Sequence, residues 1–323
     1  MLANELSYRS LIKDELQQTE SLLLQPSEDA LPVLKNAIQA VINGGGKRLR
    51  PALTILTAYL CHADAQKSIT LAAAIEMLHT ATLIHDDFID DARIRRGTET
   101  LNAHWPPAAT VLAGDLVFSW AAQLISQVNT PKLMQRFAET LTTICTGELN
   151  QMFKGRGQIP TQSAYYERIR EKTASLFIIA TEGAAILANC PEEECRALAC
   201  FGDRLGLAFQ IADDVLDFMS TSESLGKPVG SDLRQGLVTL PVLVYMEKHP
   251  KDPRLKMLLT DTTSEALLQA VIADLRSSDA AEQAMVIAET QIQQALDILK
   301  AYPSSPYRDA IEEIAIFAIH RRY

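Results

Sequence analysis

Long segments of this 323-residue chain repeat apolar residues at α-helical spacing, and this periodicity constrains the fold more than any other feature. Only 14 glycines and 14 prolines punctuate the chain, and alternating runs of β-branched residues are scarce. The pattern therefore predicts an all-α protein. The helices are expected at about residues 4–24, 28–42, 51–63, 67–91, 107–128, 131–155, 163–189, 192–220, 239–248, 264–276, 279–301 and 305–322.

No feature of the sequence divides these helices into separate domains. The chain has neither a fixed-period repeat nor a linker rich in serine and glycine. We therefore expect one large helical domain over residues 1–323. The helices at about 67–91, 173–189 and 201–218 carry little charge except at particular positions, a pattern typical of central helices that are packed on most sides.

Charge and cysteine content exclude several classes of protein. The formal net charge is −10, which argues against a surface for nucleic acid or anionic membranes, and 47% hydrophobic residues exclude a disordered chain. Cysteine is sparse and shows no CxxC spacing, which favours a reducing compartment. The N-terminus lacks the apolar core of a signal peptide, and the most apolar run, 173–190, is interrupted by Glu182. We expect a soluble cytoplasmic protein without a membrane span.

Two acidic clusters of the same form, DDxxD, lie near the ends of two apolar helices. One contains Asp86, Asp87 and Asp90, and the other contains Asp213, Asp214 and Asp217. Residues three or four apart share a helix face, so each cluster can direct three carboxylates at one point. A solvent-facing helix end is a weak alternative, because negative charge there opposes the helix dipole. Oxygen ligands without histidine or cysteine predict Mg²⁺ or Mn²⁺.

Basic residues lie at particular places relative to the acidic clusters. The glycine-rich segment 43–51 delivers three cations to a helix start, and it is no Walker A loop. The remaining cations are Arg95 and Arg96 after the first cluster, Lys172 at the start of an apolar helix, and Lys227 after the second cluster. Each alone would be read as a surface charge. Together with two metal-binding clusters they favour a diphosphate ligand, whose oxygens the metal and the cations would share.

These segments, taken in order, resemble the motifs of the trans-isoprenyl diphosphate synthase (polyprenyl synthetase) family. Residues 83–97 are similar to its first aspartate-rich motif, DDxxDxxxxRRG, and residues 209–217 are similar to the second. The intervening motifs are matched by residues 44–51, 76–81, 172–177 and 226–233. The resemblance extends from about residue 30 to the C-terminus, and the motifs are specific jointly rather than singly.

The resemblance implies an all-α isoprenoid synthase fold, with helices around a deep central cavity, and a homodimer. It implies that isopentenyl diphosphate is condensed onto an allylic diphosphate bound through Mg²⁺ at the six aspartates. Arg95, Lys172 and Lys227 would hold the allylic diphosphate, and Lys47, Arg50, His79 and Arg96 would hold isopentenyl diphosphate. Lys172, Thr173 and Gln210 would act at the reacting carbons. Without the resemblance, His79 and Gln210 would be read as hydrogen-bonded polar groups of the core.

Two positions depart from the family pattern. Leu237 follows Gly236 where the family usually has lysine, so one phosphate contact is missing or is supplied by another residue. The segment 105–107, Trp-Pro-Pro, replaces a more usual aromatic-glycine pattern. Neither departure removes an expected metal ligand.

The residues upstream of the first cluster bear on the length of the product. Ala81 and Thr82 stand one turn below the cluster, where short-chain members often carry large aromatic residues. Small side chains there leave a pocket open along the helix, and its floor would be formed by Met77, Leu78, Phe118 and Trp120, unless these are ordinary core residues. By family analogy we expect a long-chain enzyme that makes about seven to ten isoprene units for a quinone such as ubiquinone, with product release close to the membrane.

Three other functions remain open from the sequence. One is a short- or medium-chain synthase that makes farnesyl or geranylgeranyl diphosphate. Another is a non-catalytic helical partner subunit of a heteromeric synthase, which the substitution at Leu237 keeps open. The third is a terpene cyclase or head-to-head condensing enzyme, but the second cluster retains DDxxD where cyclases usually have a different metal motif.

Overall fold

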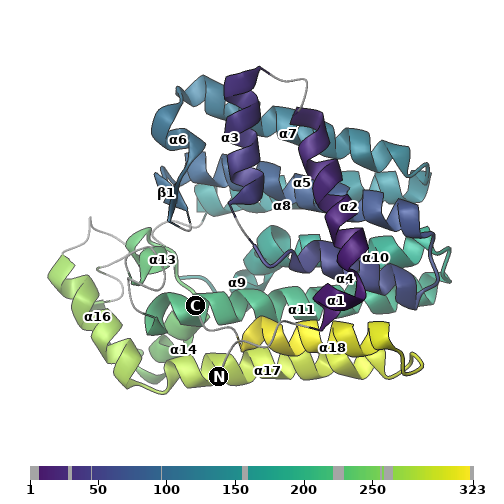
Figure 1. Cartoon of the computed structure of the whole chain (residues 1–323). Coiled ribbons are helices and arrows are strands. Elements are labelled where there is room, and N and C mark those ends of the chain that lie inside the picture. Colours follow the sequence, from purple (N-terminus) through teal and green to yellow (C-terminus); the bar gives the residue numbers. More distant parts are fainter. Residues whose placement is uncertain are drawn as a thin grey trace. The chain divides into compact units, whose positions relative to one another are not determined.

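The computed structural model describes residues 7–27, 31–44, 46–95, 97–154, 159–220, 229–254, 257 and 265–320, and within these ranges it is almost entirely helical (Figure 1). This confirms the all-α fold class. The longer helices are α2 (Lys13–Leu24), α3 (Pro32–Asn43), α4 (Leu49–Leu60), α5 (Ala65–Ile89), α7 (Pro107–Gln127), α8 (Pro131–Lys154), α10 (Ser175–Leu187), α11 (Glu192–Met219), α16 (Glu265–Ser277), α17 (Ala280–Leu299) and α18 (Pro306–Ile319). The shorter elements are α1 (Tyr8–Leu11), η1 (Gln25–Ser27), β1 (Ile94–Arg95), β2 (Thr98–Glu99), α6 (Leu101–His104), α9 (Gln162–Ile169), η2 (Arg170–Ala174), α13 (Ser231–Arg234) and α14 (Leu240–Lys248).

The helices form two compact units, each with its own buried core. The first unit comprises Met1–Glu139, Ile178–Ala199 and Leu299–Ile314, and the second comprises Thr140–Phe177, Cys200–Ile298 and Ala315–Tyr323. The single domain expected over residues 1–323 stays a prediction.

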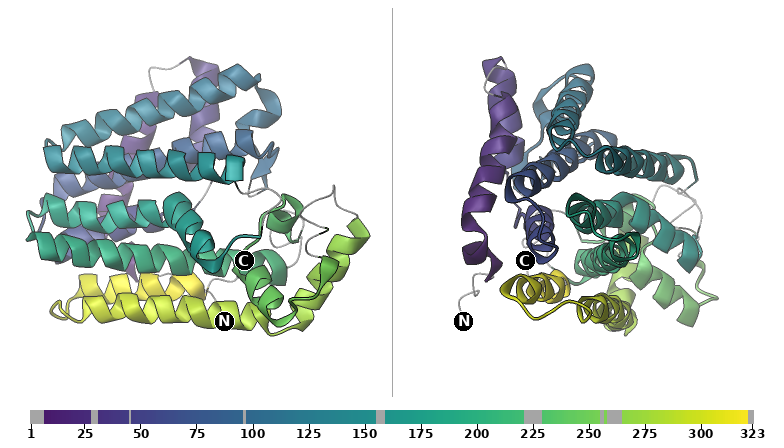
Figure 2. Two further views of the ribbon diagram at one scale, coloured as in Figure 1. Left: turned by 180° about the vertical axis from the view of Figure 1, so that it is seen from behind. Right: turned by 90° about the vertical axis from the view of Figure 1, so that its right-hand side faces the viewer.

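Helix α5 is the central element of the first unit. It packs against α7, α4 and α2, and it lies beside α7 in both views of Figure 2. Its N-terminus is capped by Asp64, whose carboxylate accepts a hydrogen bond from the backbone N–H of Lys67 at 2.8 Å. Apolar side chains are buried around most of its circumference, as the sparse charge of the segment predicts.

Helix α7 is long and apolar enough to cross a bilayer by length and composition alone. It is the one such helix among the described residues. Core helices of globular proteins pass the same test, and 44% of its most apolar window is buried within the structure. Its packing against α5 identifies it as part of the first unit's core.

Tertiary contacts divide the first expected helix. A single helix was predicted over residues 4–24, but α1 and α2 are separated at Ile12, which has φ −127°. The buried Tyr8 hydroxyl donates a hydrogen bond to the carbonyl of Lys47 at 2.8 Å, and the backbone N–H of Ser7 donates to Glu313. These contacts position α1 independently of α2.

The helix expected over residues 163–189 is three consecutive elements in the structure. A single π-helical turn, η2, separates α9 from α10. Apolar periodicity does not distinguish a π turn from an α-helix, because the burial pattern shifts by only one residue. Gly206 of α11 lies against this turn: a Cβ at this glycine would stand 2.5 Å from the Cα of Ala174.

Short elements occur in two of the stretches between the expected helices. Strands β1 and β2 form an antiparallel pair, with Ile94 opposite Glu99, around Gly97 at φ 77°. Helix α6 follows the pair, and α13 begins after Gly230 at φ 67°. Elements of two to four residues are too short to show a hydrophobic period, so the sequence did not predict them.

The close approach at Gly206 leads to a prediction. We expect Gly206→Ala to lower the free energy of unfolding by about 2 kcal/mol, because the added methyl would have to displace the backbone of Ala174. Urea denaturation measures this loss. Gly183→Ala is the matched control, since it is also a helical glycine but its added methyl would meet the movable Cδ1 of Leu133 at 3.1 Å. Equal losses for the two variants would contradict the prediction.

Candidate active site

The first aspartate cluster stands at the C-terminal end of α5. Asp87 is 7% exposed, Asp86 is half-buried, and Asp90 is exposed and caps the helix. The guanidinium of Arg95 donates a hydrogen bond to the Asp87 carboxylate at 2.6 Å. Burial raises the pKa of Asp87 above its ordinary value, and the charge of Arg95 acts against this shift. The side chain is therefore a buried carboxylate with one cationic partner.

A tight reversal of the chain brings Arg95 back to the cluster. Asp91 has φ 48°, and the backbone N–H of Ala92 donates to the carbonyl of Asp87 at 2.9 Å. The Asn102 amide donates to the carboxylate of Asp91 at 3.1 Å. Strand β1 then carries Arg95 past the end of α5, which explains why the motif places its arginine eight residues after Asp87.

A cavity of about 320 Å³ adjoins the first cluster within the first unit. Asp87 and Arg95 form its charged wall, and aliphatic residues of α3 and α5 form much of the remainder. The lining residues are Ala37, Ala40, Val41, Gly44, Leu83, Asp87, Arg95, Thr98, Glu99, Thr100, Leu101, His104 and Trp105. Its size suits a small ligand with a charged end and an apolar end.

The second cluster lies on α11, in the second unit. Asp214 is 2% exposed and accepts two hydrogen bonds, from the Tyr165 hydroxyl at 2.7 Å and from the Gln210 amide at 2.8 Å. Burial raises the pKa of Asp214 strongly, and the carboxylate of Asp232 raises it further. A buried acid beside another acid has a strong electrostatic preference for a cation.

Asp217 is positioned by the start of α13. The hydroxyl of Ser231 donates to its carboxylate at 2.8 Å, and the backbone N–H of Asp232 donates at 3.3 Å. Asp213 is half-buried on the same helix. Protein hydrogen bonds thus hold the carboxylates of Asp214 and Asp217 in defined orientations.

Thr173 and Gln210, which are predicted to act at the reacting carbons, are connected to the second cluster by hydrogen bonds. The hydroxyl of Thr173 donates to the Gln210 side-chain carbonyl at 2.6 Å, and the Gln210 amide donates to Asp214. Lys172 forms an ion pair of 2.6 Å with the mostly buried Glu148. Lys172 and Thr173 both belong to the π turn, an irregularity that is frequent at functional sites.

The cations of the glycine-rich segment 43–51 lie in two different environments. Arg48, at φ 50°, is directed inward, where it pairs with the buried carboxylate of Glu76 at 3.0 Å. Lys47 is exposed, and Arg50 and His79 are half-buried in the same unit. Arg48 is therefore a structural cation, and the predicted phosphate ligands of this segment are Lys47 and Arg50.

Two predicted phosphate ligands, Arg96 and Lys227, lie outside the described residues. Among the predicted chain-length residues, Met77, Leu78, Ala81 and Trp120 are buried, whereas Thr82 and Phe118 are half-buried. They stand on α5 and α7, which pack together. The 320 Å³ cavity is lined by other residues, so the floor of a product pocket stays a prediction.

Sequence reasoning missed several residues that organise these clusters. Ser231 and Asp232 lie within the motif at 226–233, but the resemblance assigns them no role. Tyr165 and Glu148 carry no local signal in the sequence. Tyr165 contacts Asp214, which lies 49 residues later in the chain, and Glu148 pairs with Lys172 of another helical segment. The donor set fits a hard divalent cation, since each cluster presents carboxylate oxygens near the end of its own helix.

The inward ion pair of Arg48 leads to a prediction. We expect Glu76→Ala to lower the free energy of unfolding by about 3 kcal/mol, because it removes the buried carboxylate that pairs with the mostly buried guanidinium of Arg48. Glu20→Ala is the control: this exposed carboxylate lies 3.7 Å from the same arginine, and its removal changes stability by less than about 1 kcal/mol. Chemical denaturation distinguishes the two, and equal effects would contradict a structural role for Arg48.

Comparison with known proteins agrees with this site. The polyprenyl synthetase family model matches residues 31–275. Heptaprenyl diphosphate synthase component 2 of Bacillus subtilis is 34% identical over 97% of this chain and 90% of its own. The geranyl-diphosphate-specific all-trans-nonaprenyl-diphosphate synthase of Rhodobacter capsulatus is 38% identical over 87% of each chain.

A solved structure gives the same result. The polyprenyl synthase of Caulobacter crescentus, crystallised with calcium and isoprenyl diphosphate, is 33% identical and superimposes with a TM-score of 0.91 over 98% of this chain and 97% of its own. The family model covers both aspartate clusters, and the similarity extends over nearly the whole length. The chain therefore belongs to the polyprenyl synthetase family.

Proposed function

We propose that this prenyltransferase is a Mg²⁺-dependent trans-polyprenyl diphosphate synthase, which condenses isopentenyl diphosphate head to tail onto an allylic diphosphate. The observation that carries the proposal is the pair of aspartate clusters, each with buried carboxylates fixed by neighbouring donors. Members of the family that are named for long-chain products support the reaction class.

The chain's own residues bind and orient the substrates in this proposal. Arg95, with 37% of its side chain exposed, can contact a diphosphate oxygen while it remains close to Asp87. Lys172 exchanges its partner Glu148 for the same anion. The Thr173–Gln210–Asp214 chain of hydrogen bonds fixes two polar dipoles, which can stabilise positive charge on an allylic carbon.

The metal would be held by Asp86, Asp87, Asp90, Asp213, Asp214 and Asp217. When bound, Mg²⁺ (or Mn²⁺) neutralises the charge that develops on the departing diphosphate. The raised pKa of Asp214, which follows from burial next to Asp232, fits a carboxylate that is stabilised by a cation. Calcium and isoprenyl diphosphate in the Caulobacter crescentus relative support a divalent metal at this kind of site.

We infer a long product, of about seven to ten isoprene units. The small side chains of Ala81 and Thr82 precede the first cluster on α5 and support this length. A heptaprenyl and a nonaprenyl synthase among the relatives are in keeping with the range. The product would serve as a quinone side chain, and a cytoplasmic enzyme would release it close to the membrane. A farnesyl or geranylgeranyl synthase is the alternative that product sizing tests.

A partner subunit without independent activity is a second candidate. The Bacillus subtilis relative is named as component 2 of its synthase, and Leu237 stands where the family usually has lysine. Both aspartate clusters are nevertheless complete. Turnover by the isolated chain distinguishes the two functions.

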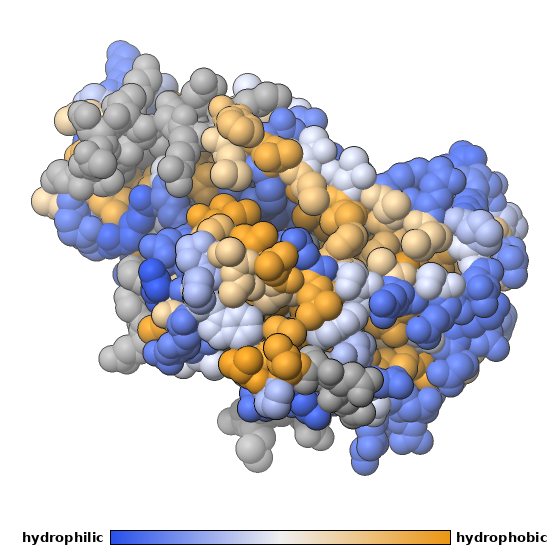
Figure 3. Space-filling view, turned by 90° about the horizontal axis from the view of Figure 1, so that it is seen from above, coloured by the Kyte–Doolittle hydropathy of each residue, from blue (hydrophilic) through white to orange (hydrophobic). Residues whose placement is uncertain are grey.

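We also infer a homodimer. The face of the first unit where α3, α6 and α7 lie carries apolar residues grouped among hydrophilic ones (Figure 3). Leu112 of α7 is 65% exposed and Val111 is also exposed. An apolar helix with this much exposed surface is typical of an interface between subunits. Light scattering coupled to size-exclusion chromatography measures the mass, and a monomer at micromolar concentration would contradict the inference.

The elongation assay tests the reaction. We expect the isolated chain to incorporate labelled isopentenyl diphosphate into an allylic primer when Mg²⁺ is present, and Asp86→Asn or Asp213→Asn to lower kcat/KM by about 100-fold or more. Asp91→Asn is the matched control, because Asn also adopts the left-handed φ of 48° and its oxygen still accepts the hydrogen bond from Asn102. No elongation with primers of any length would overturn the proposal.

A substitution at Ala81 tests the length of the product. If the space below the first cluster holds the growing chain, Ala81→Phe shortens the product and leaves the thermal midpoint nearly unchanged. If Ala81 is ordinary core, the added ring overpacks it, lowers stability by about 1–3 kcal/mol and leaves the length unchanged. Chromatographic sizing of the products and thermal denaturation of the same variant give both readouts.

A further inference from the structure

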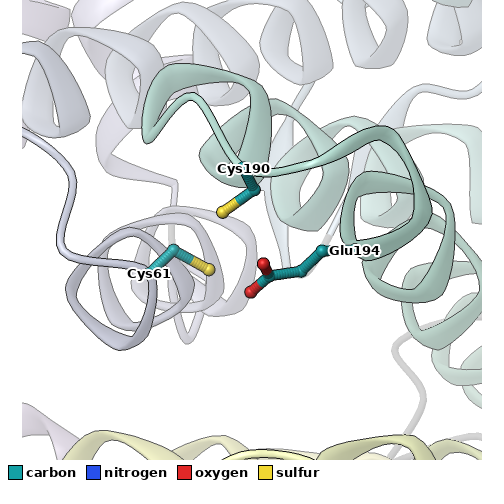
Figure 4. Close-up of side chains that lie close together, drawn as sticks. All are labelled: Cys61, Cys190 and Glu194. Atoms are coloured by element: carbon teal, nitrogen blue, oxygen red, sulfur yellow. The ribbon is translucent and has the colours of Figure 1, made fainter.

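A cluster of soft ligands lies in the first unit, apart from both aspartate clusters. The Sγ atoms of Cys61 and Cys190 and a carboxylate oxygen of Glu194 all lie within 4.8 Å of one another. Figure 4 shows the two sulfur atoms and the carboxylate directed into one small space. All three side chains are half-buried, and neither cysteine is in a disulfide.

Helix ends fix the positions of the three ligands. Cys61 caps α4, and the chain turns after it at His62, which has φ 59°. Cys190 follows a similar left-handed turn at Asn189, φ 56°, after α10, and its N–H donates to the carbonyl of Ala185 at 3.0 Å. Glu194 lies in the first turn of α11. The cluster thus joins two segments that are far apart in the sequence.

We propose that Cys61, Cys190 and Glu194 bind a Zn²⁺ ion that joins the end of α4 to the start of α11, with water as the fourth ligand. The geometry supports this directly. Zinc–sulfur bonds of about 2.3 Å in a tetrahedron place two sulfurs about 3.8 Å apart. Ligand atoms that already lie within 4.8 Å reach this spacing through small side-chain rotations.

The chemistry of the donors selects zinc over the metal of the aspartate clusters. Thiolates are soft ligands and favour Zn²⁺, whereas Mg²⁺ requires oxygen ligands. Burial, together with the negative charge of Glu194, raises the pKa of the Cys190 thiol to about 11, so a thiolate there requires a compensating positive charge. A divalent cation supplies this charge and displaces the thiol protons. The hydroxyl of Tyr302 lies against this cluster and forms a side-chain hydrogen bond with Glu194.

The test uses the full-length chain, reduced and stripped of metal, and titrated with Co²⁺ in place of Zn²⁺. We expect one equivalent of Co²⁺ to produce thiolate-to-metal charge-transfer absorption, which oxygen ligands of the aspartate clusters do not give, and Zn²⁺ to displace it. Cys61→Ser and Cys190→Ser should each lose this absorption. Cys145→Ser and Cys200→Ser, which alter exposed cysteines outside the cluster, should retain it.

Further measurements keep the proposal falsifiable where a variant folds poorly. Zn²⁺ should raise the thermal midpoint of the wild-type chain, and Glu194→Gln, which keeps both thiols, should weaken Zn²⁺ binding in a competition titration. Absence of charge-transfer absorption in the reduced wild-type chain would overturn the proposal, as would its persistence in Cys61→Ser. The proposal would also be overturned if the isolated protein forms a Cys61–Cys190 disulfide and, after reduction of this disulfide, binds no metal.

Discussion

Two buried carboxylates, Asp87 and Asp214, place the strongest constraint on this protein. Each stands near the C-terminal end of a long apolar helix, where the helix dipole and the loss of water both disfavour negative charge. Hydrogen-bond donors that lie close in space offset the cost of burying each carboxylate. Arg95 reaches Asp87 through a tight reversal and a two-residue strand, and Tyr165 and Gln210 donate to Asp214. The β pair adjoins Asp87, and the π turn and the short helix α13 are linked by hydrogen bonds to the second cluster, so these irregular elements are found next to the two clusters.

Helical periodicity predicted most of the fold, because helices longer than about ten residues show their buried face in the sequence. The central helix was expected at 67–91 and spans Ala65–Ile89. Breaks within helices were not predictable in this way. The interruption at Ile12 depends on the contact of Tyr8 with Lys47, and the π turn accompanies the approach of Gly206 to Ala174. Such contacts join distant segments and leave no periodic signal.

The candidate site was predictable to the extent that its chemistry is local. The DDxxD clusters were recognisable because three acids within five residues share a helix face. The partner Tyr165 was not, because it precedes Asp214 by 49 residues. The partner of Arg48 in the basic segment was not predictable either, because Glu76 follows it by 28 residues. The sequence counted Arg48 among three cations for a phosphate, whereas the structure pairs it with Glu76. Local charge patterns therefore identify the ligand class, and tertiary pairing decides which cations remain for it.

The central claim is that the aspartate clusters bind a diphosphate through a divalent metal. Isothermal titration of inorganic diphosphate, with and without Mg²⁺, tests this claim directly and without turnover. The account predicts that diphosphate binds with Mg²⁺, that binding is lost when Mg²⁺ is chelated, and that Asp86→Asn weakens it while Asp91→Asn does not. Equal affinity for diphosphate in the presence and absence of Mg²⁺ would contradict the account, because the arginine and lysine side chains alone would then suffice to bind it.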